Sequence, residues 1–78
     1  MGRREIAEKV ISRVNFVGMC NADLSSHLKN DLGLDSLDMI ELGIQLNKSL
    51  HINIDEDTLL NLNNCTVSDV VDYLEEHL

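Results

Sequence analysis

The sequence predicts an all-α protein: a four-helix bundle with three main helices, one short third helix and a long first loop. Apolar residues recur at helical spacing in several segments, and two of these segments open with a capping-box pattern. No segment alternates long enough to predict a sheet. With 78 residues, one Phe, one Tyr and no Trp, we expect a single domain over residues 1–78 with an aliphatic core.

The first helix is expected from about residue 3 to 16, followed by a long loop over residues 17–35. Asn15 and Gly18 suit the end of the helix, whose apolar face is formed by Ile6, Ala7, Val10, Ile11 and Val14. Turn-forming residues dominate the loop, but leucines recur through it. We therefore expect the loop to fold back and bury Leu24, Leu28, Leu32 and Leu34.

The second helix is expected to begin at Asp35–Ser36 and to continue to about residue 50. Asp35 is a good N-cap, and Asp38 stands three residues later as the acid of a capping box. On a helical wheel of about 100° per residue, Leu37 and Ile44 fall at the edge of the polar sector, where solvent or a partner would meet them. That sector holds Asp38, Glu41, Gln45 and Lys48.

Two more helices complete the bundle. A short one is expected from Asp55 to about Leu62, because acidic residues at 55–57 suit a helix N-terminus. Thr66 is expected to cap the last helix, with Asp69 completing its capping box. The apolar face of this helix is formed by Val67, Val70, Val71, Leu74 and Leu78.

Charge is unevenly distributed along the chain. Residues 1–13 hold four basic and two acidic side chains, net +2, whereas residues 14–78 hold two lysines against twelve acids, net −10. Such a surface repels nucleic acid and anionic lipid and favours basic protein surfaces. No apolar run reaches the length of a membrane span, and residues 1–5 lack the features of a secretory signal. We therefore expect a cytoplasmic protein in which Cys20 and Cys65 are reduced thiols.

The most informative segment runs from Asp31 to Leu42 and places a serine at the first turn of a helix. A helix N-terminus favours an attached anion, so a phosphodiester on Ser36 would lie in a favourable field. Asp35 and Asp38 would oppose that charge, which makes them better suited to a basic partner than to the phosphate. On the local pattern alone, a plain helix-start serine is the simpler interpretation.

The pattern G-x-D-S-L-D-x-x-E-L, from Gly33 to Leu42, resembles the signature of acyl carrier proteins. The resemblance continues in order through residues 55–57 and 66–74 and so covers nearly the whole chain. It implies a monomeric, non-catalytic, metal-free carrier whose Ser36 receives 4′-phosphopantetheine from coenzyme A through a phosphopantetheinyl transferase. The arm would hold acyl intermediates as thioesters and deliver them to fatty-acid or related biosynthetic enzymes.

The resemblance also implies two surfaces for partners and cargo. The start of the second helix would dock acyl-transfer and chain-elongation enzymes through their basic surfaces, and the matching residues are Asp35, Leu37, Asp38, Glu41 and Ile44. The helical wheel indicates the same residues independently. An acyl chain would shelter between the helices, with these candidate lining residues: Leu42, Leu46, Ile54, Leu62, Val70 and Leu74.

The sequence departs from the usual carrier pattern where partner choice and cargo size would be set. Asn47 and Lys48 replace the acids often found late in the second helix, and no proline precedes Asp55. The stretch over residues 55–67 is about two residues longer than usual. Two alternatives therefore stay open: a dedicated carrier of polyketide or aminoacyl cargo, and an unmodified acidic helical adaptor. Asp35 before the serine favours the acyl branch over the aminoacyl one.

Other classes fit the sequence less well. A serine enzyme needs a base and an orienting acid beside the nucleophile, but His27, His51 and His77 all lie far from Ser36 in the sequence. A calcium loop could start at Asp55, but Leu59 replaces the next ligand and the required Gly and Glu are missing.

Overall fold

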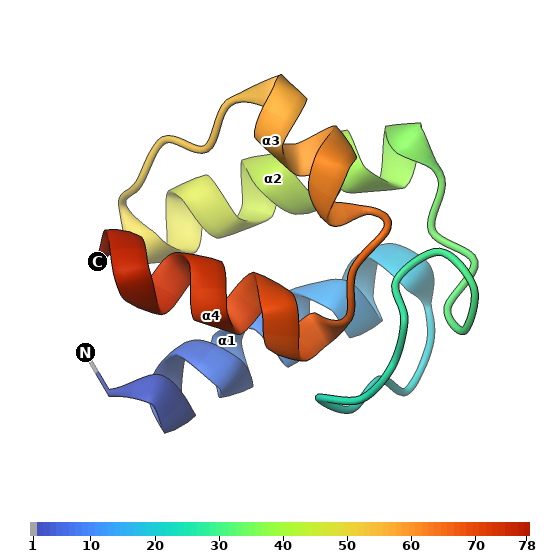
Figure 1. The fold of residues 1–78 in the computed structure, drawn as a ribbon, viewed down its shortest axis with the longest axis horizontal. Helices are drawn as coiled ribbons and strands as arrows, with labels where there is room; N and C mark the ends of the chain where they lie inside the picture. Colours follow the sequence, from blue (N-terminus) through green and yellow to red (C-terminus); the bar gives the residue numbers. More distant parts are fainter. Residues whose placement is uncertain (1) are drawn as a thin grey trace.

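A computed structural model describes residues 2–78, which form four helices around one apolar core (Figure 1). The helices are α1 (Arg3–Gly18), α2 (Ser36–Leu50), α3 (Glu56–Leu62) and α4 (Val67–His77). The all-α prediction is confirmed, including the short third helix and the long first loop. Among these residues the only β-type pairing is an isolated bridge between His27 and Thr66.

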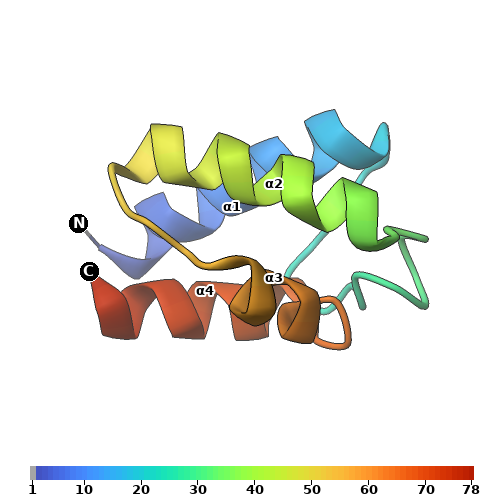
Figure 2. The ribbon, with the colours of Figure 1, turned by 90° about the horizontal axis from the view of Figure 1, so that it is seen from above.

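The three long helices run roughly along the long axis of the molecule, and α3 lies across them beside α2 (Figures 1 and 2). In both views the start of α2 lies at the opposite end of the bundle from the two chain ends. The core between the helices is aliphatic except for Met39, as the composition predicted. Its buried residues are Ile6, Val10, Val14, Leu28, Leu34, Met39, Leu42, Leu46, Leu50, Ile54, Leu59, Val67, Val70, Val71 and Leu74.

The first helix ends later than the sequence indicated. It continues through Gly18, and Met19 terminates it in the left-handed conformation with φ 49°. Gly18 therefore serves packing and is not the stop signal: a Cβ at this position would lie 2.8 Å from Leu34 Cδ2. The close approach of Leu34 brings the segment before α2 against the end of α1.

The long loop over residues 19–35 is held against the start of α4 by backbone hydrogen bonds. Leu28 N–H donates to the Cys65 carbonyl at 3.0 Å, and Val67 N–H donates to the Ser26 carbonyl at 2.9 Å. The predicted burial is confirmed for Leu28 and Leu34 and partly for Leu32. It is wrong for Leu24, which is 40% exposed and contributes its carbonyl, an acceptor for Ser68 N–H, instead of its side chain.

A glycine in the middle of α2 allows α3 to pack closely against the α2 backbone. Gly43 is buried, and a Cβ there would collide with the side chain of Leu59 from α3. Glycine inside a helix costs about 1 kcal/mol relative to alanine, so its presence needs a packing reason. The close approach of Leu59, itself 5% exposed, supplies that reason and fixes α3 against the backbone of α2.

Candidate functional site

The start of α2 is built by a complete capping box. Asp35 Oδ1 accepts the Asp38 N–H at 2.9 Å, and Asp38 Oδ2 accepts the Asp35 N–H at 3.2 Å. Both roles were predicted from the sequence and are confirmed. The box fixes where the helix begins and makes Ser36 its first residue.

Ser36 is exposed at this helix start and its side chain makes no hydrogen bond within residues 2–78. In the same part of the chain, the N–H groups of Ser36 and Leu37 have no acceptor. Unpaired N–H groups and the positive end of the helix dipole favour an anion at this point. A phosphate ester on the Ser36 oxygen therefore fits the residues present.

The two aspartates beside Ser36 are not placed as ligands of a phosphate. Each uses a carboxylate oxygen to accept a backbone N–H of the capping box. A negative group on Ser36 would be repelled by both carboxylates, at a strength reduced by the surrounding water. Their outward charge is instead available to a basic surface approaching from solvent.

Of the five predicted docking residues, Asp35 is the N-cap of α2 and the other four lie on the first three turns of the helix. Leu37 is 73% exposed and Ile44 is 44% exposed, although both are large apolar side chains. The carboxylates of Asp35, Asp38 and Glu41 form no ion pair within residues 2–78, where the salt bridges are Arg3–Asp72, Arg3–Glu75 and Arg4–Glu8. Exposed apolar side chains among unpaired acids are typical of a surface that meets a basic partner.

The six residues predicted to line an acyl cavity belong to the core or contact it. Five are buried, namely Leu42, Leu46, Ile54, Val70 and Leu74, and Leu62 is half-buried against the same cluster. All six belong to one apolar cluster or pack against it. The lining role therefore stays a prediction, because plain core packing accounts for the same burial.

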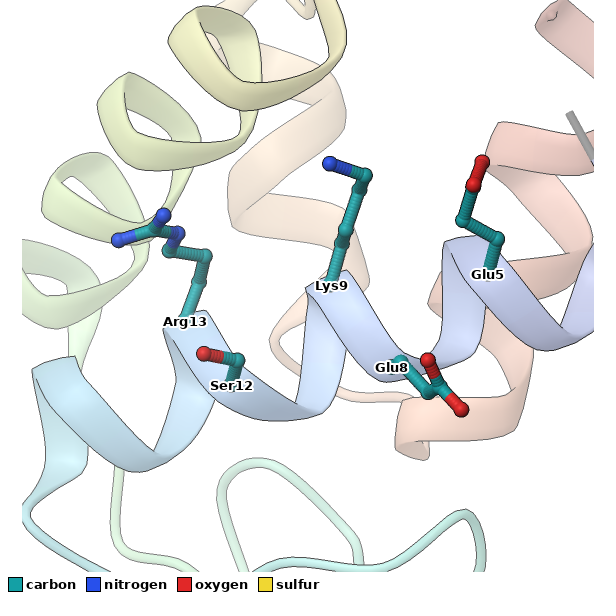
Figure 3. A pocket seen from close by; sticks show the side chains of 5 residues that line it. All are labelled: Glu5, Glu8, Lys9, Ser12 and Arg13. Atoms are coloured by element: carbon teal, nitrogen blue, oxygen red, sulfur yellow. The ribbon is translucent and has the colours of Figure 1, made fainter.

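Other features of residues 2–78 lie away from Ser36. A surface hollow over α1 is lined by Glu5, Glu8, Lys9, Ser12 and Arg13, a charged face of one helix that holds none of the predicted site residues (Figure 3). No group of three or more potential metal ligands occurs within the described range. None of the helices described is long and apolar enough to cross a membrane.

Each histidine is engaged elsewhere in the fold. His27 Nδ1 accepts the Asn30 N–H, His51 ends α2 in the left-handed conformation, and His77 stacks on Tyr73. None of the three forms a hydrogen bond with Ser36. None of the three histidines is therefore placed to act as a base for this serine.

One residue near the site was missed by the sequence reasoning. Asn63 follows α3, and its Nδ2 donates to the Leu34 carbonyl at 2.8 Å, two residues before Ser36. The sequence showed only three asparagines close together, at positions 61, 63 and 64. The contact joins positions 29 apart in the chain, and no local pattern signals it.

Comparison with known proteins gives a consistent result. A family model described as a phosphopantetheine attachment site matches residues 9–74. The chain is 39% identical over 77 residues to an acyl carrier protein of Amoebophilus asiaticus, covering 95% of this chain and 94% of the relative. It is 35% identical over 79 residues to an acyl carrier protein of Porphyromonas gingivalis, covering 95% and 96%. An acyl carrier protein of Phytoplasma australiense is 46% identical over 55 residues, 70% of each chain.

Proposed function

Because the chain belongs to the acyl carrier protein family, we propose that Ser36 is the residue that carries its phosphopantetheine group. The protein is a non-catalytic carrier, and its prosthetic group is 4′-phosphopantetheine. When bound, this group supplies a terminal thiol that holds an acyl intermediate as a thioester.

The observation that carries the proposal is the open start of α2. Ser36 is exposed, its hydroxyl is free, and the adjacent N–H groups of Ser36 and Leu37 are unpaired within residues 2–78. The hydroxyl oxygen would form a new P–O bond to the phosphorus that bears the pantetheine, and its proton would pass to a base of the transferase. The pyrophosphate bond of coenzyme A would break, with adenosine 3′,5′-bisphosphate as the leaving group. The two N–H groups would then face the phosphate and hold it at the positive end of the helix.

A carrier interacts with modifying and biosynthetic enzymes, and we propose that these dock on the first three turns of α2. Asp35, Asp38 and Glu41 would attract the basic surface of a phosphopantetheinyl transferase or of an acyl-transfer or chain-elongation enzyme. Leu37 and Ile44 would add apolar contact area once the partner has arrived. The exposure of these two side chains and the unpaired acids around them support this proposal.

The cargo and the compartment are also proposals. We propose that an acyl chain shelters among the core residues Leu42, Leu46, Ile54, Leu62, Val70 and Leu74, where apolar surface is already gathered. We further propose that the protein acts in fatty-acid synthesis in the cytoplasm. Cys20 and Cys65 are both unpaired thiols, which suits a reducing compartment.

The test is intact mass spectrometry after incubation with coenzyme A, Mg²⁺ and a broad-specificity phosphopantetheinyl transferase. We expect the wild type and Ser12→Ala to gain one phosphopantetheine unit and Ser36→Ala to gain none. Ser12 is the matched control because it is an exposed serine on α1. Circular dichroism should show that Ser36→Ala stays folded, since Ser36 is exposed and its hydroxyl makes no hydrogen bond within the described residues.

Two outcomes would contradict the assignment. Mass gain by Ser36→Ala would place the arm on another residue. Absence of gain in the folded wild type, with the transferase active on another carrier, would favour an unmodified acidic adaptor.

A further inference from the structure

The peptide group between Leu34 and Asp35 is held from both sides. Its carbonyl accepts a hydrogen bond from Asn63 Nδ2 at 2.8 Å, and its N–H donates to Asp38 Oδ2 at 3.2 Å. This is the peptide directly before the N-cap, and Ser36 follows one residue later. Rotation of the peptide plane would break both bonds and turn Asp35 out of its capping position.

The residue on the N-terminal side of this peptide group, Leu34, is fixed in the core. Leu34 is anchored, with its side chain 2% exposed and its N–H bonded to the Leu28 carbonyl at 3.0 Å. The peptide after Leu34 leads from this buried anchor to the exposed residues Asp35 and Ser36. The Asn63 amide restrains this peptide on its carbonyl side.

Asn63 donates from a fixed part of the molecule. It ends α3, which Leu59 seats on the backbone of α2 at Gly43. Its neighbours Asn61 and Asn64 are exposed, and their side chains form no hydrogen bond within residues 2–78, whereas Asn63 is half-buried. Three similar residues therefore stand close together in the chain, and one of them contacts the segment that presents Ser36.

We propose that Asn63 is a positioning residue for the modification of Ser36. It fixes the Leu34–Asp35 peptide, keeps the capping box closed and so presents the Ser36 hydroxyl to the transferase in one orientation. The inference rests on the proposed attachment at Ser36 and adds the residue that prepares it. Without the Asn63 amide, part of the binding energy of the transferase would be used to order the start of α2.

The experiment compares Asn63→Asp with Asn64→Asp and Asn61→Asp, which make the same change of charge and size at neighbouring positions. Aspartate lacks the amide donor, so we expect kcat/KM for phosphopantetheine transfer to fall about fivefold in Asn63→Asp, equivalent to about 1 kcal/mol. The two controls should stay within about twofold of the wild type. In NMR spectra, the Leu34 carbonyl carbon and the Asp35 amide nitrogen should shift in Asn63→Asp only.

A second control separates positioning from a general loss of stability. Thr66→Ala removes the N-cap of α4 and destabilises the fold without touching the Leu34 carbonyl. Under conditions where all variants are folded, it should be modified at the wild-type rate. Equal slowing by Thr66→Ala and Asn63→Asp would overturn the proposal, as would equal rates in Asn63→Asp and Asn64→Asp.

Hydrogen exchange in the wild-type protein provides an independent test that does not require any variant to fold. The side-chain amide protons of Asn63 should exchange with solvent more slowly than those of Asn61 and Asn64. Equal exchange at the three positions would overturn the inference. If the wild type is not modified at all, the proposed attachment at Ser36 is contradicted instead. The failure of the attachment proposal can therefore be distinguished from the failure of the Asn63 proposal.

Discussion

The starts of α2 and α4 have the same local chemistry and different surroundings. Each has a complete capping box, Asp35 with Asp38 in α2 and Thr66 with Asp69 in α4. In α4 the next two N–H groups are also paired, because Val67 and Ser68 donate to carbonyls of the first loop. In α2 the corresponding N–H groups, those of Ser36 and Leu37, find no acceptor within residues 2–78.

The difference shows that the capping motif does not by itself mark a functional helix start. At α4 the loop closes over the helix end and the first residue, Val67, is buried in the core. At α2 the first residue is exposed and two N–H groups and a hydroxyl are left unpaired. The helix start that the fold leaves open is the one suited to a group added from outside.

The largest expected effect contrasts two leucines, one beside each helix start. Leu28 is fully buried under the start of α4, so Leu28→Ala should lower the free energy of unfolding by about 2–5 kcal/mol through lost burial and the cavity left behind. Leu37 is 73% exposed at the start of α2, so Leu37→Ala should change it by no more than about 0.5 kcal/mol. Urea denaturation measures both.

The same pair also tests function. Leu37→Ala should weaken the interaction with a docking enzyme while leaving the fold unchanged. Equal destabilisation by the two substitutions would show that the start of α2 is as much a part of the core as the start of α4, and would remove the contrast.

Local patterns in the sequence predicted both helix starts. A capping box joins two residues three positions apart, so it can be recognised from the sequence alone. The two boxes here are Asp35 with Asp38 and Thr66 with Asp69. The exposure of Leu37 and Ile44 followed from the helical period in the same way. The capping boxes depend on residues within one helical turn, and the exposure of the two side chains depends on the helix face. Both can be predicted from the spacing of residues in the sequence.

What the sequence did not predict depends on contacts between distant segments. Gly18 was interpreted as a stop signal, but its lack of a side chain admits Leu34. Gly43 admits Leu59 from another helix, and Asn63 reaches the Leu34 carbonyl across 29 positions. Leu24 is an apolar residue of the kind usually buried, yet the course of the loop turns its carbonyl, not its side chain, toward α4. Each of these depends on how the helices pack.

A smaller effect is expected from charge at the open helix start. Glu41→Lys reverses a charge on the proposed docking surface, and Glu76→Lys makes the same change on α4, where Glu76 is exposed and outside any salt bridge among the described residues. Glu41→Lys should slow transfer to Ser36 by about twofold to fivefold at low salt, because it removes attraction to a basic partner. Glu76→Lys should have little effect.

Salt provides the control for this prediction. Screening shortens the range of the interaction to about 8 Å at physiological ionic strength and about 3 Å at 1 M, so the difference between the two variants should shrink as salt is added. Stopped-flow or initial-rate measurements over a salt series would show this. Equal rates for the two variants at low salt would place docking away from α2.

The smallest effect concerns the start of α3, which is capped by Asp55 alone. Its carboxylate accepts a hydrogen bond from the Thr58 N–H at 2.9 Å. Hydrogen bonds from the Thr58 side chain and then its backbone lower the pKa of Asp55 below its ordinary value. Because the pKa is lower in the folded state, this contribution to stability is fully present above the unfolded pKa of about 3.9 and is lost as the pH falls through the folded value.

Carboxyl-carbon NMR should therefore show Asp55 titrating below about 3.9, with the Thr58 amide shift following the same curve. Asn is also a good N-cap, so Asp55→Asn should keep α3 capped while removing this part of the pH dependence. Titration of Asp55 at or above the ordinary value would contradict the cap. The result also refines the comparison of α2 with α4. The start of α3 has an effective cap and exposed acids but no serine, and the hydroxyl residue of its first turn, Thr58, is half-buried.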